Sequence, residues 1–305
     1  MEPPTTFKDH LAKLTNSWQG LPDKPEENPE ETLRALWCLA AGDPRCIERA
    51  AQIALPPLTE TEWIHLNELI EMRMAGVPLA HLTGRQQFMG IEMLVGPEAL
   101  IPRKETEILG SAALEKLEQL ILERGSALVI DLCTGAGNLA LALAHQARGC
   151  RVFGSDLSPD AVGLARRNSL HLRLQDRVKF WEGDSFAPFE SAEFVGQADM
   201  VVCNPPYISS AKVEDMPDEI SGYEPRLAFD GGPFGVNFMI RLVRDAHQFL
   251  KPAAWLCFEV GLGQGRAMEA KCRAAGHYRN VETVENTEGQ IRAILAQTAV
   301  AHNPA

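Results

Sequence analysis

Short apolar segments alternate with helical patterns between residues 126 and 260, and this alternation restricts the possible folds more than any other feature of the sequence. The apolar segments are residues 127–130, 151–156, 178–181, 200–203 and 255–260. Nearly continuous apolar strands separated by helices are typical of a parallel sheet that helices cover on both faces. We therefore expect an α/β fold in this part of the chain.

The first 80 residues carry a different pattern, that of helices. Asn28 precedes Pro29, which suits the first turn of a helix, and Thr59 with Glu62 has the spacing of a capping box. Apolar residues at helical spacing follow both starts. No dense group of chemically active side chains occurs here, so these helices favour a packing or partner-recognition role.

A third pattern separates these two parts. Gly84, Gly90 and Gly96 divide short apolar pieces such as residues 91–95, which is typical of a hairpin. The sequence therefore predicts three parts: a helical substrate-recognition domain at 1–80, a hairpin linker at 81–102 and a catalytic α/β domain at 103–305.

Composition and charge exclude several classes of protein. Hydrophobic residues make up 45% of the chain, as in ordinary globular proteins, and no stretch reaches the roughly 18 apolar residues of a membrane helix. The net charge of −12 disfavours direct binding to nucleic acid. Seven cysteines without a CxxC pair suit a reducing compartment and predict no metal site. We expect a cytoplasmic protein without a targeting signal or membrane contact.

Polar residues follow the predicted strands at their carboxyl ends. They are Asp131, Asp156, Asp184, Asn204 and Glu259. In a parallel sheet these ends meet at one edge, where ligands bind. A single acid at such a position is common, but five polar residues in succession predict a site.

The segment 131–137 after the first strand is a small-residue turn that lets the backbone approach a ligand. Asp156 follows Gly135 by 21 residues, a spacing typical of an acid that accepts hydrogen bonds from ribose hydroxyls. A dinucleotide-binding enzyme shares this arrangement. However, Cys133 and Asn138 stand where a complete GxGxxG motif would have glycines.

Asn204-Pro205-Pro206-Tyr207 follows the fourth strand and gives the sharpest signal. Two consecutive prolines form a rigid loop that presents backbone carbonyls. The Asn204 side-chain oxygen and the Pro205 carbonyl are two acceptors, and Tyr207 is an aromatic surface. Together they suit a planar group that bears an NH₂.

These motifs resemble those of S-adenosylmethionine-dependent methyltransferases that modify NH₂ nitrogens. More narrowly, the chain resembles the HemK-type protein-glutamine N5-methyltransferases over about residues 78–275. Besides the motifs above, the resemblance rests on residues 81–84, 100–107 and 223–232. It departs from the family at Cys133, where glycine is usual, and at residues 287–290, where the usual C-terminal motif is replaced.

The resemblance implies a Rossmann-like seven-stranded methyltransferase domain, preceded by a small helical domain and a hairpin. It implies S-adenosylmethionine as cofactor and the Gly-Gly-Gln glutamine of peptide-chain release factors as substrate. The cofactor-binding residues it implies are Asp131, Thr134, Gly135, Gly137, Asp156, Asp184 and Asn204. The catalytic ones are Asn204, Pro205 and Tyr207. Substrate binding falls to Asn204, Pro205, Pro206, Tyr207, Arg103 and Glu105.

Three alternatives stay open at this point. A sister branch with the same Asn-Pro-Pro-Tyr motif methylates a glutamine of a ribosomal protein. Adenine N6-methyltransferases of nucleic acid use the same motif on a flipped base, although the net charge of −12 disfavours them. The third alternative is a binding protein that kept the fold and lost catalysis, which only Cys133 favours.

Overall fold

The structure is a computed structural model that describes residues 6–18, 24, 27–214 and 222–299. Its helices of four or more residues are α1 (Phe7–Asn16), α2 (Pro29–Ala40), α3 (Ile47–Ala50), α4 (Glu60–Met74), α5 (Leu79–Thr83), α6 (Thr106–Arg124), α7 (Asn138–Gln146), α8 (Pro159–His171), α9 (Ser210–Val213), α11 (Asn237–Asp245) and α12 (Gly265–Ala274). Within the described residues, no helix combines the length and the apolar character needed to cross a bilayer.

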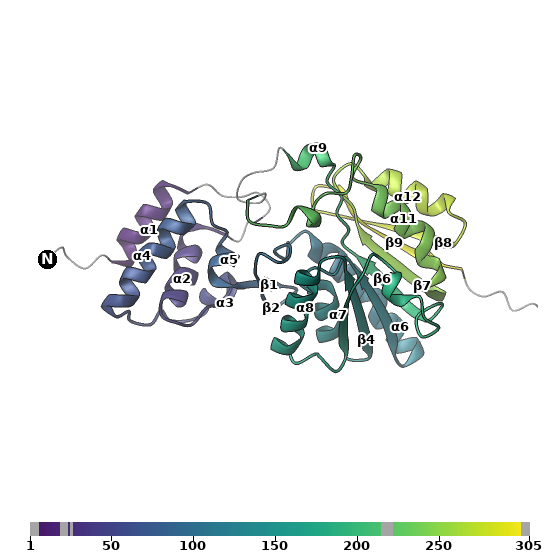
Figure 1. Ribbon diagram of the computed structural model, residues 1–305, viewed down its shortest axis with the longest axis horizontal. Helices are drawn as coiled ribbons and strands as arrows, with labels where there is room; N and C mark the ends of the chain where they lie inside the picture. Colours follow the sequence, from purple (N-terminus) through teal and green to yellow (C-terminus); the bar gives the residue numbers. More distant parts are fainter. Residues whose placement is uncertain (1–5, 19–23, 25–26, 215–221, 300–305) are drawn as a thin grey trace, which may run out of the picture.

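Helices α1 to α5 pack around a hydrophobic core of their own, which includes Leu33, Leu36, Leu66 and Ile70. Both predicted helix starts are confirmed. The Asn28 side chain accepts a hydrogen bond from the Glu31 backbone at the start of α2, and Thr59 with Glu62 forms a capping box at the start of α4. These helices lie at one end of the molecule, away from the sheet (Figure 1).

A two-stranded antiparallel hairpin follows, made of β1 (Arg85–Phe88) and β2 (Ile91–Leu94). Helix α5 runs past the expected boundary at residue 80. It ends where Gly84 adopts a left-handed φ of 64°, a conformation that glycine takes without strain.

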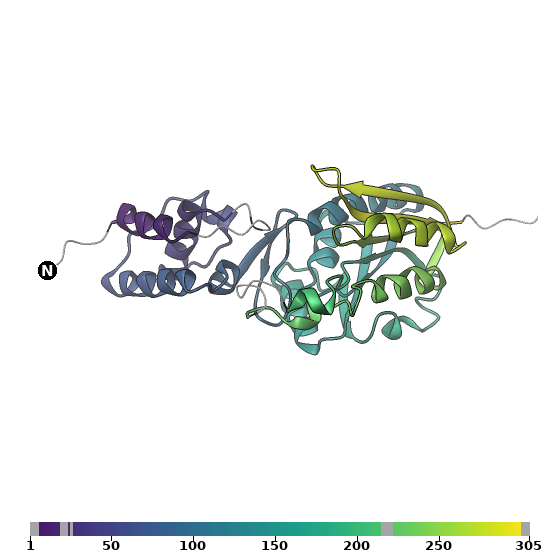
Figure 2. The same ribbon diagram turned by 90° about the horizontal axis from the view of Figure 1, so that it is seen from above.

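The hairpin makes hydrogen bonds to both of its neighbours. The Glu92 carboxylate accepts a bond of 2.9 Å from the Cys46 backbone at the start of α3. On the other side, Leu94 and the Asn168 side chain of α8 exchange two bonds, of 2.6 and 3.0 Å. Viewed from above, the hairpin bridges the helical end and the sheet (Figure 2).

The central sheet has seven strands in the order β5-β4-β3-β6-β7-β9-β8. They are β3 (Ala127–Leu132), β4 (Cys150–Asp156), β5 (Val178–Glu182), β6 (Ala198–Cys203), β7 (Leu250–Glu259), β8 (Tyr278–Glu285) and β9 (Ile291–Thr298). Strands β3 to β7 pair in parallel, whereas β9 is antiparallel to both of its neighbours. The expected α/β fold with a seven-stranded sheet is confirmed.

Alternate side chains of each strand face opposite layers of helices. In β3, Val129 packs in the core beneath α6, α7 and α8, while Ile130 packs in the core beneath α11 and α12. The chain runs outward from β3 through β4 to β5, then returns to place β6 on the other side of β3. This reversal opens a crevice at the carboxyl ends of β3 and β6, the position where such folds bind ligands.

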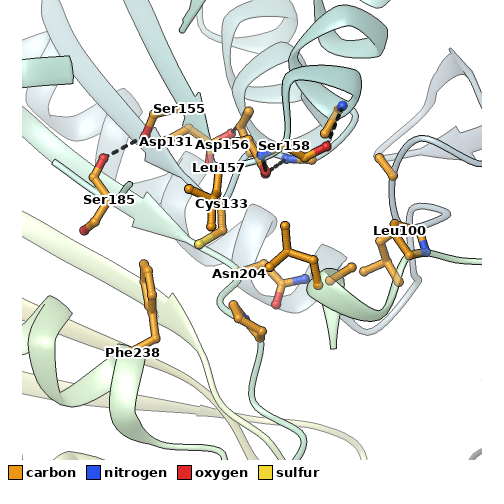
Figure 3. Close-up of a pocket in the computed structure, with 18 of the residues that line it drawn as sticks. Leu100, Asp131, Cys133, Ser155, Asp156, Leu157, Ser158, Ser185, Asn204 and Phe238 are labelled. Carbon is orange, nitrogen blue, oxygen red and sulfur yellow. Dashed lines mark hydrogen bonds between the residues drawn. The ribbon is translucent and has the colours of Figure 1, made fainter. Parts of the chain in front are cut away.

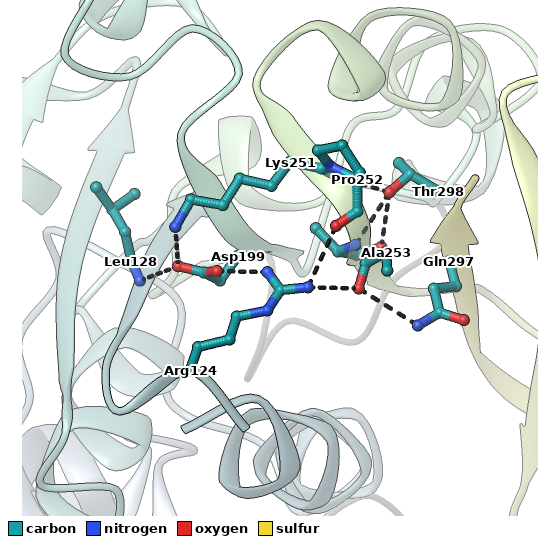
Figure 4. Close-up of polar contacts among 9 residues, drawn as sticks. Arg124, Leu128, Asp199, Lys251, Pro252, Ala253, Gln297 and Thr298 are labelled. Carbon is teal, nitrogen blue, oxygen red and sulfur yellow. Dashed lines mark hydrogen bonds and ion pairs between the residues drawn. The ribbon is translucent and has the colours of Figure 1, made fainter. Parts of the chain in front are cut away.

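An ionic cluster around the buried Asp199 lies at the opposite end of the same strands (Figure 4). The Asp199 carboxylate in β6 accepts hydrogen bonds from Arg124, Lys251 and the Leu128 backbone, at 2.6, 2.8 and 2.8 Å. It thereby joins α6, β3, β6 and β7 at the amino ends of the strands. The carboxyl ends stay open for a site.

Candidate active site

A cavity of about 560 Å³ lies at the carboxyl ends of the central strands (Figure 3). Most of the residues that the sequence analysis assigned to the cofactor line this cavity, together with two assigned to the substrate. They are Asp131, Thr134, Gly135, Asp156, Asp184, Asn204, Pro206 and Arg103. Residues from four strand ends therefore meet in one place, as the parallel arrangement predicted.

Asp131 forms part of the cavity wall and is only 1% exposed. One carboxylate oxygen accepts hydrogen bonds from the Thr134 hydroxyl and the Ala140 backbone. The other oxygen, Oδ1, is buried and has no hydrogen-bond partner among the described residues. Burial raises the pKa of this carboxyl to about 7. A buried acceptor with unused capacity suits a ligand that brings a cationic or N–H group.

The turn after β3 has an unusual backbone, with positive φ angles at Cys133 (53°), Gly135 (55°) and Gly137 (84°). Gly135 lies on the cavity wall, where the missing side chain leaves room for a ligand. Gly137 does not line the cavity. It is the N-cap of α7, and a Cβ there would lie 2.9 Å from Phe180.

Asp156 connects the turns after β3 and β4 at the edge of the cavity. Its two oxygens accept hydrogen bonds from the Gly135 backbone and the Ser158 backbone, each at 2.9 Å. A carboxylate oxygen can accept more than one hydrogen bond, so both oxygens of Asp156 can still accept a bond from a ligand. Burial raises the pKa of this carboxyl, and backbone hydrogen bonds, including those from Ser158 and Gly135, offset only part of the rise.

Asp184 lies near the mouth of the cavity and forms a two-pronged ion pair with Arg241 of α11, at 2.9 and 2.6 Å. The sequence analysis missed Arg241 and two apolar residues of the same wall, Leu157 and Phe238. Leu157 directly follows Asp156 in the sequence, so its position at a strand end could have identified it as a residue of the cavity wall. Nothing local marks Phe238 or Arg241, because they reach the cavity from a helix on one face of the sheet.

The Asn204–Tyr207 loop lies between this cavity and a second, smaller one of about 200 Å³. Asn204 lines both cavities, whereas Pro205, Tyr207 and Glu105 line only the smaller one. The Asn204 side-chain nitrogen donates a hydrogen bond of 3.0 Å to the Thr106 hydroxyl. The loop thus lies between a larger and a smaller cavity, and the Asn204 carboxamide is shared by both.

Tyr207 connects the loop to a buried charge. Its hydroxyl donates a hydrogen bond of 2.9 Å to Glu259, which is 1% exposed and also accepts a bond of 3.3 Å from Arg292 of β9. Glu259 lines neither cavity, unlike the other strand-end residues. The sequence analysis gave no role to Arg292 or Thr106, since neither follows a predicted strand.

Two segments that the resemblance relied on meet beside the smaller cavity. The buried Glu224 carboxylate forms an ion pair of 2.5 Å with Arg103 and accepts a hydrogen bond of 2.8 Å from the Ile101 backbone. This contact joins residues 100–107 to residues 223–232 and fixes Arg103, which lines both cavities.

A seven-stranded sheet with an acid, a glycine-containing turn and an Asn-Pro-Pro-Tyr loop at its switch point defines a methyltransferase. The profile of the methyltransferase small domain family matches residues 109–219, which include the turn and this loop. Among solved structures, the hMettl16 catalytic domain shares the fold with a TM-score of 0.56, at 16% identity, over 77% of this chain and 83% of that one.

The particular family follows from sequence relatives. The chain is 36% identical over 260 residues to the release factor glutamine methyltransferase of Moorella thermoacetica, covering 85% of this chain and 87% of the relative. It is 30% identical to the one of Caulobacter vibrioides, over 96% of this chain and 99% of the relative. This chain belongs to the release factor glutamine methyltransferase family.

Proposed function

We propose that this protein transfers a methyl group from S-adenosylmethionine to the side-chain amide nitrogen, N5, of a protein glutamine. The glutamine belongs to the Gly-Gly-Gln motif of a peptide-chain release factor. The observation that carries the proposal is the position of Asn204, whose carboxamide lies between a large cavity walled by acids and a small adjoining one. The relatives are named release factor glutamine methyltransferases, which supports the choice of substrate.

The residues of the larger cavity fit the proposed cofactor. The unused Asp131 oxygen suits its ammonium group, and the open space at Gly135 admits its methionine part. Asp156 offers its remaining acceptor capacity to the ribose hydroxyls. Asp184 lies where it would meet the adenine, beside the apolar Phe238. When bound, the cofactor supplies an electrophilic methyl group on a sulfonium.

The smaller cavity then receives the glutamine side chain. Arg103, Glu105, Pro205 and Tyr207 line it and would contact the substrate polypeptide, while Pro206 faces the larger cavity. The ion pair between Arg103 and Glu224 keeps this wall in place.

The chemistry requires positioning more than base catalysis. An amide nitrogen is a weak nucleophile, because its lone pair is delocalised into the carbonyl. The Asn204 side-chain oxygen and the Pro205 carbonyl accept the two amide hydrogens and turn the lone pair toward the methyl group. The cofactor, held by Asp131 and Asp156, would supply the methyl group and retain the electron pair of the S–C bond, and the substrate nitrogen would gain positive charge. The two acceptors would stabilise that charge until the nitrogen releases a proton to solvent.

The Asn204→Ala variant tests the proposal. It should lower the rate of methyl transfer about 10²-fold or more, the usual effect of removing one transition-state hydrogen bond, and leave cofactor affinity nearly unchanged. Incorporation of tritiated methyl groups measures the rate with a release factor, a ribosomal protein and DNA offered side by side. Calorimetry measures the affinity.

Asn280→Ala is the matched control, because Asn280 is exposed on β8 and far along the sheet from the site. It should methylate at the wild-type rate. Transfer to the ribosomal protein or to DNA in place of the release factor would contradict the proposed substrate. An unchanged rate in Asn204→Ala would contradict the proposed mechanism.

A further inference from the structure

The Asn204–Tyr207 loop contains two prolines in succession, which have no N–H group to hold the loop in place. The loop therefore depends on the contacts of the residues that follow the prolines. The Ile208 backbone bonds in both directions: its N–H donates to the Phe229 carbonyl at 3.0 Å, and its carbonyl accepts from the Gly231 N–H at 2.8 Å. These bonds fasten the chain just beyond the loop, and Tyr207 itself needs a further contact.

The Gln264 side chain provides that contact from the turn after β7. Gln264 directly precedes α12, but its side chain forms no cap hydrogen bond with that helix. Instead its nitrogen donates to the Tyr207 carbonyl at 2.9 Å and to the Gly235 carbonyl at 3.3 Å. Its oxygen accepts from the Gly261 backbone at 2.9 Å. One carboxamide thus joins three separate segments of the chain.

The backbone partners decide which end of the Gln264 carboxamide faces the loop. A carbonyl only accepts a hydrogen bond, and a backbone N–H only donates one. Two carbonyls lie at one end of the carboxamide and one N–H lies at the other. A half-turn of the amide would therefore break all three bonds and bring like groups together, so the donation to Tyr207 has a fixed direction.

Two glycines let these segments approach Tyr207 closely. A Cβ on Gly235, whose φ is 67°, would collide with the Tyr207 carbonyl. A Cβ on Gly261 would lie 2.9 Å from the Tyr207 ring and 2.8 Å from the Gln264 side-chain oxygen. Tyr207 therefore packs directly against the backbone of both neighbouring segments that Gln264 bonds.

We propose that Gln264 is a positioning residue that holds the Tyr207 end of the Asn204–Tyr207 loop against the turn after β7. The inference rests on the proposed function, since this loop brings Pro205 and Tyr207 to the smaller cavity. Tyr207 is then held at both ends, because its hydroxyl donates to Glu259 at 2.9 Å. Without the donation from Gln264, the carbonyl of Pro205, two residues away, loses its alignment with the amide hydrogens of the substrate.

Gln264→Glu and Gln264→Met form the test. Glutamate keeps the length of the side chain and the acceptor for Gly261 but replaces the donor with an oxygen that faces two carbonyls. Methionine keeps the length and loses both groups. In both variants kcat should fall about 10-fold or more, because a displaced loop misaligns the reacting groups. The KM for the cofactor should change by less than about threefold, since Gln264 lines neither cavity.

Two other roles for Gln264 predict different results. If the side chain only supports the turn after β7 through Gly261, glutamate keeps that bond and should keep the wild-type kcat. If the side chain only fills space, methionine should keep the wild-type kcat. A wild-type kcat in either variant would therefore overturn the inference.

Gln146→Glu is the matched control. The Gln146 nitrogen also donates to a backbone carbonyl, that of Met89, at 3.0 Å. Gln146 ends α7 and lines neither cavity, so this variant should keep the wild-type kcat. Melting temperatures of all three variants check that kcat is measured on folded protein. An equal fall of kcat in the control would overturn the inference.

The proposed function fails separately from this inference. If the wild-type enzyme leaves Gly-Gly-Gln proteins unmethylated, the proposed substrate is wrong. The two Gln264 variants are then compared on the ribosomal protein or DNA that the enzyme does methylate, because both present an NH₂ group. A wild-type enzyme that methylates none of the three would overturn both proposals.

Discussion

Asp131 and Asp199 show how the same side chain serves two purposes in one sheet. Both are 1% exposed. Asp199 meets two cations and a backbone N–H, so its charge is fully used in holding elements together. Asp131 has an oxygen without a partner among the described residues and a pKa raised to about 7. A buried, unsatisfied carboxyl in a cavity is typical of a functional site.

This difference predicts opposite effects of the same substitution. The folded-state pKa of Asp131, about 7, exceeds its ordinary value of 3.8, so the unfolded chain loses the proton first. Asp131 therefore lowers the free energy of unfolding as pH rises from about 4 to 7, and the penalty persists above that range. Asp131→Asn removes this penalty. The free energy of unfolding of the variant minus that of the wild type should therefore be larger at pH 8 than at pH 5.

Asp199→Asn is the control for that experiment. It leaves Arg124 and Lys251 without their buried partner and should lower the free energy of unfolding at pH 8 by about 1–3 kcal/mol, since both cations are partly exposed. Urea denaturation at the two pH values measures both variants. Equal destabilisation of both at pH 8 would contradict the assignment of Asp131.

At the scale of elements, the turn from β3 to α7 depends on its backbone more than on its side chains. Three of its residues have positive φ, yet only Gly137 packs closely against neighbours on several sides: Phe180, Leu141 and Ala165. The packing of Gly137 therefore places the start of α7 against β5 and α8.

Gly137→Ala should therefore cost more stability than a glycine-to-alanine change elsewhere. Gly263 also has a positive φ, of 82°, but has open space around it, so Gly263→Ala adds only the left-handed strain of about 1–2 kcal/mol. Gly137→Ala adds a steric clash of about 1–3 kcal/mol to the same strain. Chemical denaturation compares the two, and equal losses would show that the neighbours of Gly137 yield easily.

The elements also explain what the sequence could and could not predict. Asp131, Asp156 and Asn204 were found because each follows an apolar strand, and chain direction places parallel strand ends together. The residue pattern located five strands; β8 and β9 were expected only through the resemblance. Strand β8 mixes exposed polar residues with Tyr278 and Val281, because it lies at the edge of the sheet.

Thr106, Arg241 and Arg292 had no such signal. Each belongs to a helix or strand that is brought to the site by packing between residues 33 to 98 positions apart in the chain. Thr106 reaches Asn204 across 98 residues, and Arg292 reaches Glu259 across 33. A local pattern cannot report contacts of this length, although it does report the strand ends that those contacts support.

At the scale of the whole molecule, the helices α1 to α5 have a hydrophobic core of their own, and the hairpin lies between them and the sheet (Figure 1). Polar contacts of the helical end with the rest of the chain include the hydrogen bond from the Cys46 backbone to Glu92 and the ion pair of 3.3 Å between Lys104 and Glu48. Helix α4 exposes Ile64, Met72 and Met74, of which Ile64 is 58% exposed. We propose that this surface helps to dock the protein substrate.

Ile64→Asp tests the docking proposal without removing any element. It should weaken methylation of an intact release factor several-fold and leave methylation of a short Gly-Gly-Gln peptide unchanged, because the peptide reaches only the cavities. Leu122→Asp is the control, since Leu122 is 88% exposed on α6, within the sheet-containing part. Equal loss on protein and peptide would contradict a docking role for α4.

The position of β9 carries a consequence for how the protein matures. Among the described residues it is the strand nearest the C-terminal end, yet it inserts between β7 and β8 and brings Arg292 to Glu259. Chains emerging from the ribosome fold from their N-terminal end. The residues around the larger cavity are therefore synthesised well before the arginine that balances Glu259. A nascent chain that already has the residues of the larger cavity still lacks the arginine that pairs with Glu259, the hydrogen-bond partner of Tyr207, until β9 enters the sheet.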